Sequence, residues 1–200
     1  MIRSVAALVT ALLFSTLCFA QDLDHHKLLN HLDNYGNLHL RNKPYTTLPD
    51  GLVVNGNLNV AKTAIKMLPN KLEVKGSLDA SDSLVEFMPR GTKITGYANF
   101  IGSQLKAWPA GVVPGGYINL TDTPITKLPN GMYVKGDLSV IRTKLTELPN
   151  GLVVEGNLYL GGSKITTFPK KLTVQGNIYL GGNTITQWPE DLTLGGAVAR

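Results

Sequence analysis

The stretch Leu148-Pro-Asn-Gly-Leu-Val-Val-Glu-Gly-Asn-Leu-Tyr-Leu-Gly-Gly-Ser-Lys-Ile-Thr-Thr167 decides the fold, because it is one copy of a unit that recurs every twenty residues. The frame runs from residue 29 to residue 196 without insertion or deletion. A fixed period of this length is typical of a solenoid, in which each repeat buries its apolar side against its neighbours. Proline and glycine mark the period, at Pro49, Pro69, Pro89, Pro109, Pro129, Pro149, Pro169 and Pro189, and at Gly36, Gly56, Gly76, Gly96, Gly116, Gly136, Gly156, Gly176 and Gly196.

Each repeat contains an alternation of apolar and polar residues, as in residues 52–60. Val54, Leu58 and Val60 fall on one side of this alternation and asparagines fall on the other. A period of two indicates a β-strand with one buried face. Gly56 interrupts the apolar side, and a glycine inside a strand pattern marks a bend or a close backbone approach. We therefore expect a corner at each such glycine, with no space for a side chain and with freedom to adopt positive φ.

The second half of each repeat ends in a large apolar residue followed by proline, as in Leu68-Pro69. The residue before a proline favours an extended conformation, and proline suits a corner because it donates no backbone hydrogen bond. A column of small hydroxyl residues precedes this segment on the inner side, and we expect its hydroxyls to bond backbone groups of adjacent coils. Its members are Thr63, Ser83, Ser103, Thr123, Thr143 and Ser163.

These patterns predict a mainly β protein, a single elongated β-solenoid of about eight coils of twenty residues. We assign residues 1–20 to a signal peptide, 21–35 to an N-terminal cap and 36–200 to the repeat solenoid. The cap should contain a short helix with Leu28, Leu29 and Leu32 on its buried side. Its histidines have poor spacing for a shared metal site, so we expect no metal and no cofactor.

Residues 1–20 have the features of a secretory signal: Arg3 near the start, then an apolar run, then a small-residue end at Ala20. The apolar run is short for a membrane-spanning helix. Cleavage after Ala20 would remove the only cysteine, Cys18, which fits an oxidising compartment. We therefore expect a secreted or periplasmic/cell-envelope protein with no transmembrane segment after cleavage. Lipidation of Cys18 is the alternative, but Leu17 is a poor match before a lipid-bearing cysteine.

Two places depart from the regular pattern. In the repeat at 88–107, Ala98 stands where other repeats have leucine, and we expect Phe100 and Trp108 to fill the volume. Pro114 stands where other coils have valine or isoleucine, so a strand should be broken there or lie at the rim. The last coil begins at Leu192, and no polar cap follows it, so its open edge could pair with another chain.

The repeat Leu-Pro-x-Gly-Leu-x-Val-x-Gly-x-Leu-x-Leu-x-x-Thr-x-Ile-x-x resembles a bacterial leucine-rich repeat, and its period is similar to that of type III secreted effectors. The match is carried by Leu158, Leu160, Ser163 and Ile165 and their counterparts over residues 36–196. Serine or threonine replaces the usual asparagine except at Asn183. A three-sided β-helix therefore stays open as an alternative. The resemblance implies binding of a protein or ligand through an extended face; the effectors' ligase domain has no counterpart here, so that activity does not carry over.

Exposed aromatic residues are the candidate binding residues, because aromatic side chains on a rigid sheet form recognition surfaces. The alternative is that such pairs only stabilise the ladder. An outward threonine column from Thr126 to Thr186 resembles ice-binding arrays but lacks their second threonine except at Thr167. The five aromatic candidates are Tyr97, Tyr117, Tyr133, Tyr159 and Tyr179.

The sequence does not contain a catalytic pattern: its acids are scattered singly, and there is no phosphate loop, nucleophile elbow or His-Glu metal motif. The net charge of +5 is spread over the repeats without a long basic run, so a nucleic acid is not an expected partner. We therefore expect a non-enzymatic, exported protein that binds a protein or glycan through one solenoid face. The alternative is a structural element that self-assembles through its C-terminal coil.

Overall fold

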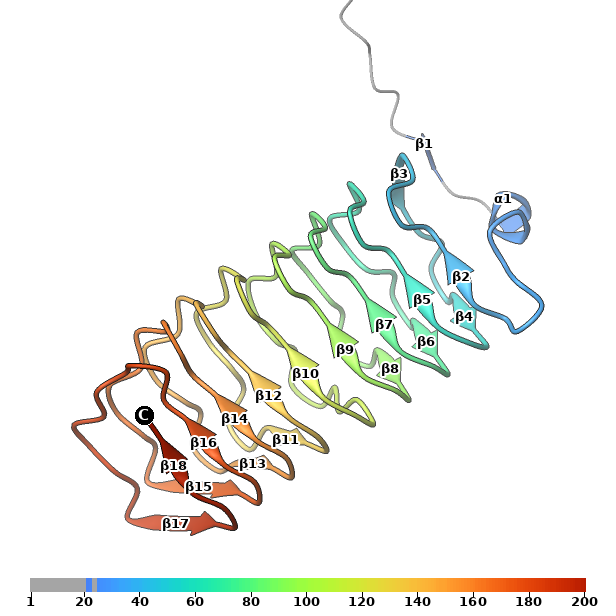
Figure 1. Cartoon of the computed structure of the whole chain (residues 1–200). Helices are drawn as coiled ribbons and strands as arrows, with labels where there is room; N and C mark the ends of the chain where they lie inside the picture. The colour runs from blue at the N-terminus through green and yellow to red at the C-terminus, as the bar shows by residue number, and fades with distance from the viewer. Residues whose placement is uncertain (1–20, 23–24) are drawn as a thin grey trace, which may run out of the picture.

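The computed structural model describes residues 21–22 and 25–200, and over this range the chain forms an elongated β-solenoid (Figure 1). The coils stack side by side, and β2 and β18 lie at opposite ends of the longest sheet. The predicted fold class is confirmed, since every coil has the same twenty-residue length and pairs in parallel with the coil before it. The predicted signal peptide lies outside the described residues.

One face is a nine-stranded parallel sheet, which we call the long sheet. Its register is strict: Leu38 pairs with Leu58, and Leu58 pairs with Leu78, one period further along. The strands are short because a glycine corner precedes each one. The long sheet consists of β2 (Leu38–His39), β5 (Leu58–Asn59), β7 (Leu78–Asp79), β9 (Ala98–Asn99), β10 (Ile118–Asn119), β12 (Leu138–Ser139), β14 (Leu158–Tyr159), β16 (Ile178–Tyr179) and β18 (Val198–Ala199).

A second face is divided into a three-stranded and a four-stranded parallel sheet, and we call it the divided face. The coil between the two sheets has no strand at residues 112–114, which confirms the break expected at Pro114. Proline cannot donate to the ladder. The first sheet is β4 (Val53–Val54), β6 (Glu73–Val74) and β8 (Lys93–Ile94); the second is β11 (Tyr133–Val134), β13 (Leu152–Val154), β15 (Lys171–Val174) and β17 (Asp191–Leu194).

A third side of the coil, before the prolines, carries isolated parallel bridges such as Met67 to Phe87 and Ala107 to Lys127. Parallel pairing therefore follows three sides of the coil, as expected for the three-sided β-helix that the sequence left open. The outward threonines of this side are exposed, and Thr186 donates through Oγ1 to the carbonyl of Thr166 at 3.1 Å.

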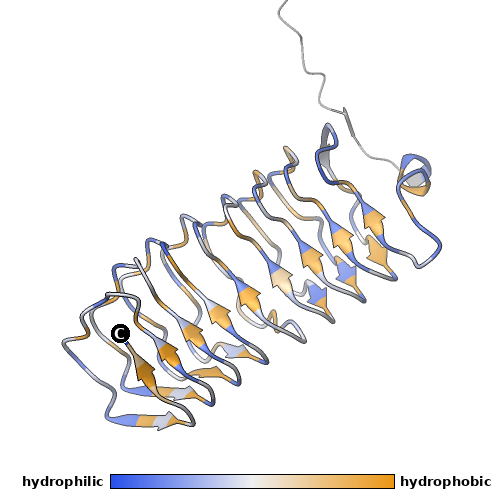
Figure 2. Cartoon of the chain, in the orientation of Figure 1, coloured by the Kyte–Doolittle hydropathy of each residue, from blue (hydrophilic) through white to orange (hydrophobic). Residues whose placement is uncertain are grey.

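The core is a set of apolar columns along the inside of the solenoid. Its residues on the strands recur from coil to coil as the orange segments of Figure 2. Its members at one coil, Leu72, Val74 and Leu78, are fully buried. In the irregular coil, Phe100 and Trp108 are also buried and contact each other edge to face, with ring centroids 5.9 Å apart. This confirms that two aromatic rings occupy the volume left by Ala98.

The recurring glycines lie at corners because the preceding coil approaches there. A Cβ atom on Gly76 would lie 2.7 Å from the backbone of Gly56, closer than any side chain tolerates. Gly76 also donates its N–H to the carbonyl of Gly56 at 2.9 Å. Of this column only Gly36 has a positive φ, so close approach, and not backbone conformation, requires glycine at the other corners apart from Gly116.

Five of the six members of the inner hydroxyl column are buried as predicted and Ser163 is half-buried, but the hydrogen bonds of the column differ from the prediction. Thr63 donates to the carbonyl of Val60 at 2.7 Å, three residues earlier in the same coil, and Thr123 bonds the carbonyl of Leu120 in the same way. These inner hydroxyls therefore bond within their own coil and not to the adjacent coil. The longer Asn183 does reach it, because its Nδ2 group donates to Ser163 Oγ at 2.7 Å.

The N-terminal cap contains helix α1 (His25–Leu29), and strand β1 (Gln21–Asp22) pairs in parallel with β3 (Tyr45–Thr47). The helix is confirmed, but the prediction of its buried side was wrong in part. Leu28 is buried, whereas Leu29 is 66% exposed, because adjacent residues of a helix point about 100° apart. Leu32 lies beyond the end of the helix and is 41% exposed. Among the described residues, no helix is long and apolar enough to cross a membrane.

Candidate functional site: the tyrosine face

The outer surface of the long sheet carries two pairs of stacked tyrosines, and we call this surface the tyrosine face. Tyr97 and Tyr117 precede β9 and β10, and their rings stack at 4.5 Å with planes 7° apart. Tyr159 and Tyr179 belong to β14 and β16, and their rings stack at 4.8 Å with planes 4° apart. Each pair joins equivalent positions of consecutive coils, so the ring separation follows the strand spacing.

In the twenty-residue repeat, the position of Tyr97 and Tyr117 is two residues before that of Tyr159 and Tyr179, so the two pairs form separate rows along the sheet. A shallow depression lies between the two rows. This depression has a volume of about 210 Å³. Tyr117 closes one side and Tyr159 the other, with the intervening coil of β12 between them. It is lined by Tyr117, Ile118, Asn119, Asp137, Ser139 and Tyr159.

Polar groups between the tyrosines offer both donors and acceptors. Asn119 uses its Oδ1 atom to accept the N–H of Thr121 at 3.1 Å, which leaves its Nδ2 group available as a donor. The Asp137 carboxylate accepts the N–H of Asn157 at 2.7 Å. Ser139 shares a hydrogen bond of 2.8 Å with the Thr121 hydroxyl. These contacts fix the positions of the polar side chains before any ligand arrives.

The surroundings of the Tyr117 and Tyr159 hydroxyls favour their protonated form, because both pKa values are raised. Partial burial, together with the neighbouring Tyr97 and Asp79, raises the pKa of the Tyr117 hydroxyl above its ordinary value. Burial and the Asp137 carboxylate beside it raise the pKa of the Tyr159 hydroxyl. Tyr97 and Tyr117 are each 38% exposed and Tyr179 is 37% exposed, so their rings are reachable from solvent.

Tyr133, the fifth predicted site residue, lies elsewhere. It belongs to β11 on the divided face, where it pairs with Val153 and its hydroxyl donates to Glu155. That hydrogen bond raises the pKa of the Tyr133 hydroxyl. The structure therefore brings together four of the five candidate tyrosines and separates Tyr133 from them.

An amide ladder beside the tyrosine pairs was missed at the sequence level. Asn37 Oδ1 accepts the N–H of Asn57 at 2.7 Å, and Asn57 Oδ1 accepts the N–H of Ser77 at 2.7 Å. The same contact links Asn157 to Asn177 at 2.8 Å. The asparagines repeat at the coil period in the sequence, and such repetition is the signal of an amide ladder. The ladder stabilises both ends of the sheet that carries the tyrosines.

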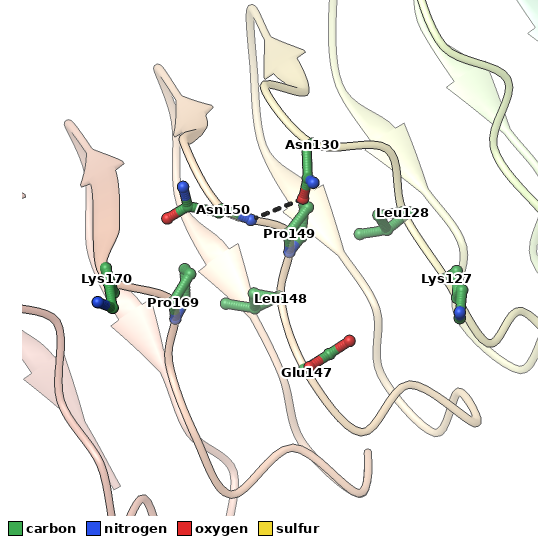
Figure 3. A pocket seen from close by; sticks show the side chains of 9 residues that line it. All are labelled: Lys127, Leu128, Asn130, Glu147, Leu148, Pro149, Asn150, Pro169 and Lys170. Atoms are coloured by element: carbon green, nitrogen blue, oxygen red, sulfur yellow. Dashed lines mark hydrogen bonds between the residues drawn. The ribbon is translucent and has the colours of Figure 1, made fainter.

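A second, larger depression of about 510 Å³ lies at the proline corner and was also missed (Figure 3). Its lining comes from three consecutive coils and includes Lys127, Leu148 and Lys170.

No group of three histidine, cysteine, aspartate or glutamate side chains suited to a metal ion occurs within the described part of the chain. In the cap, the His31 ring instead contacts the Tyr45 hydroxyl at 2.8 Å.

Comparison with protein-family models, with curated proteins and with solved structures gave no match. The resemblance to bacterial leucine-rich repeats therefore remains a hypothesis, supported by the repeat pattern alone.

Proposed function

We propose that this chain is an exported, non-catalytic binding protein that holds a neutral glycan on the tyrosine face. The observation that carries the proposal is the depression between the two stacked tyrosine pairs. Flat aromatic rings pack against the C–H faces of sugar rings, and their hydroxyls add polar contacts at the ring edge. Asp137 accepts, Asn119 donates and Ser139 does both, which matches the hydroxyl groups of a sugar.

A glycan fits this surface better than a protein does. The outward column between the tyrosines is polar, with Asn99, Asn119 and Ser139 in successive strands. The core of a protein interface is more apolar than this and poor in charged groups. The depression is also small, as suits one sugar unit of a chain that lies along the sheet.

Affinity electrophoresis through gels that contain single neutral polysaccharides tests this proposal. We expect at least one gel to retard the protein. The double substitution Tyr117→Ala and Tyr159→Ala should weaken retardation at least tenfold, because it removes both walls of the depression. Tyr133→Ala is the matched control, since it deletes an equally large ring on the divided face.

Three results would count against the proposal. The first is that no gel retards the native protein. The second is that Tyr133→Ala weakens binding as much as the double substitution does, and the third is that the double variant binds normally.

Circular dichroism melting of all variants checks that the solenoid is intact. Mass spectrometry of exported protein should give an N-terminus at Gln21 if the signal is cleaved after Ala20.

A second candidate function is self-association through the last coil. Within the described residues, β17 and β18 pair on one side only, with β15 and β16. Trp188 is 44% exposed, and Leu192 and Leu194 are only partly buried. Light scattering over a range of concentrations tests this function, and a concentration-independent monomer would contradict it.

A further inference from the structure

The proline corner carries a groove on a different side of the coil from the tyrosine face. Two depressions, of about 510 and 380 Å³, meet at Lys127 and Leu128, which line both. Together they extend from the coil of Arg90 to the coil of Lys170. The groove therefore crosses several coils roughly along the axis of the solenoid, and Figure 3 shows the part around Leu148 and Pro149.

The floor of the groove is apolar. Leu128 is only partly buried, whereas the equivalent Leu68 and Leu148 are buried. Trp108 lies beside it with its indole N–H donated to the carbonyl of Val112 at 3.0 Å, so its ring presents carbon to the groove. The inner apolar column thus opens to solvent at Leu128 and offers a hollow for an aliphatic side chain.

The rim of the groove is cationic and unpaired. Arg90, Lys127 and Lys170 are exposed, and none of them forms an ion pair among the described residues. Four other cations of the solenoid, Lys93, Lys106, Arg142 and Lys171, do have acidic partners, as Arg142 does in Asp122 at 2.6 Å. Glu147 is the single acid in the lining. The groove therefore has an excess of positive charge over an apolar floor.

The amides at the rim add hydrogen-bond donors. Asn130 Oδ1 accepts the N–H of Asn150 at 3.1 Å, and Asn150 Oδ1 accepts the N–H of Lys171 at 3.2 Å. Figure 3 shows the first of these contacts. With their oxygens occupied, both asparagines are left with Nδ2 donors. A ligand rich in acceptors, such as carboxylates, complements this set.

We propose that the groove binds an extended acidic peptide segment of a partner protein, with one aliphatic side chain over Leu128. Coils stack about 4.8 Å apart, so Arg90 and Lys170 are about 19 Å apart along the axis. An extended peptide rises about 3.3 Å per residue, so about six residues span this length. The apolar floor favours a peptide, whose side chains alternate in character, over an acidic polysaccharide.

Fluorescence anisotropy with a labelled octapeptide tests the proposal, using a peptide that carries four glutamates around one central leucine. We expect saturable binding in low salt, at least tenfold tighter than for the same peptide with glutamine at each glutamate. Replacing the central leucine with serine should also weaken binding. Binding should fall as salt is raised, because the cations are exposed.

The charge-reversal pair Lys127→Glu and Lys170→Glu should weaken binding at least tenfold. Lys75→Glu with Lys135→Glu is the matched control, because these exposed lysines lie at the glycine corners and the change in net charge is identical. Binding that is absent, or that both pairs weaken equally, would overturn the proposal. So would preferential binding of an oligouronate over the peptide. Glycan retardation by the tyrosine face should be unchanged in Lys127→Glu with Lys170→Glu, which separates the two proposals.

Discussion

The long sheet and the divided face are built from the same repeat, yet only the long sheet is continuous over all coils. One residue accounts for the difference. On the divided face, Pro114 takes the place of a valine or isoleucine, and the ladder stops between β8 and β11. On the long sheet the equivalent coil contributes β10, which pairs with strands on both sides. A solenoid can therefore lose pairing on one face without losing register on another.

The comparison also shows why a binding surface suits the long sheet. The Tyr97–Tyr117 and Tyr159–Tyr179 pairs depend on equal spacing of consecutive strands, which the uninterrupted ladder supplies. Tyr133, at the edge of the second sheet on the divided face, has no aromatic partner in the adjacent coil. Rigid, evenly spaced side chains lose little entropy when a ligand binds.

The largest expected effect comes from the core beneath the break. Phe100→Ala should destabilise the protein by about 3–5 kcal/mol, because a fully buried ring beside Trp108 is removed where the divided face gives no support. Urea unfolding measures this change. Phe87→Ala is the control, since Phe87 is 52% exposed, and it should cost less than about 1 kcal/mol. Equal costs would show that the irregular coil does not rely on its aromatic pair.

Repairing the break should have a smaller effect in the opposite direction. Pro114→Val restores a backbone donor, worth about 0.5–1.5 kcal/mol, but gives up the rigidity of proline in the unfolded chain, about 0.4–1 kcal/mol. We expect a net gain below about 1 kcal/mol by urea unfolding. Amide exchange should slow in residues 113–115 and 133–135. Unchanged exchange there would mean that something other than proline divides the face.

The smallest effect is expected at the N-terminal end of the long sheet, where Asp33 accepts hydrogen bonds from Tyr35, Asn37 and His39. The bonds from Asn37 and then His39 hold the pKa of this carboxyl well below its ordinary value of 3.8. A depressed pKa means that the stabilisation is present above pH 3.8 and is lost as the pH falls below it. The stability of the Asp33→Asn variant should therefore fall less between about pH 4 and pH 2 than the stability of the native protein. Acid unfolding followed by circular dichroism measures this difference, and identical curves for the two proteins would contradict the prediction.

Much of the fold follows from the sequence because one period fixes the columns. The sequence predicted four features: the buried strand face of Val54 and Leu58, the corner at Gly56, the break at Pro114 and the burial of Phe100. It did not predict the hydrogen-bond partners of the short inner side chains. The period places Thr63 inside the solenoid but does not show that its hydroxyl bonds a carbonyl of its own coil.

The candidate site was predictable only in part. Its tyrosines could be found as exposed aromatic residues, but the depression between Tyr117 and Tyr159 depends on the three-dimensional arrangement of side chains from three coils, which a repeat pattern does not give. The proline-corner groove depends on the partial exposure of Leu128, although the equivalent Leu68 and Leu148 are buried. A repeat pattern assigns equivalent residues the same environment and cannot reveal such exceptions.

Spin-label distances along the long sheet test the central claim, that residues twenty apart stack in register over the whole chain. With Cys18 replaced by serine, labels at His39 and Asn119 lie four periods apart, and labels at His39 and Tyr179 lie seven periods apart. Stacked coils predict separations of about 19 and about 34 Å, growing in proportion to the number of periods. A His39–Tyr179 distance no longer than the His39–Asn119 distance would contradict the solenoid and every surface assigned on it.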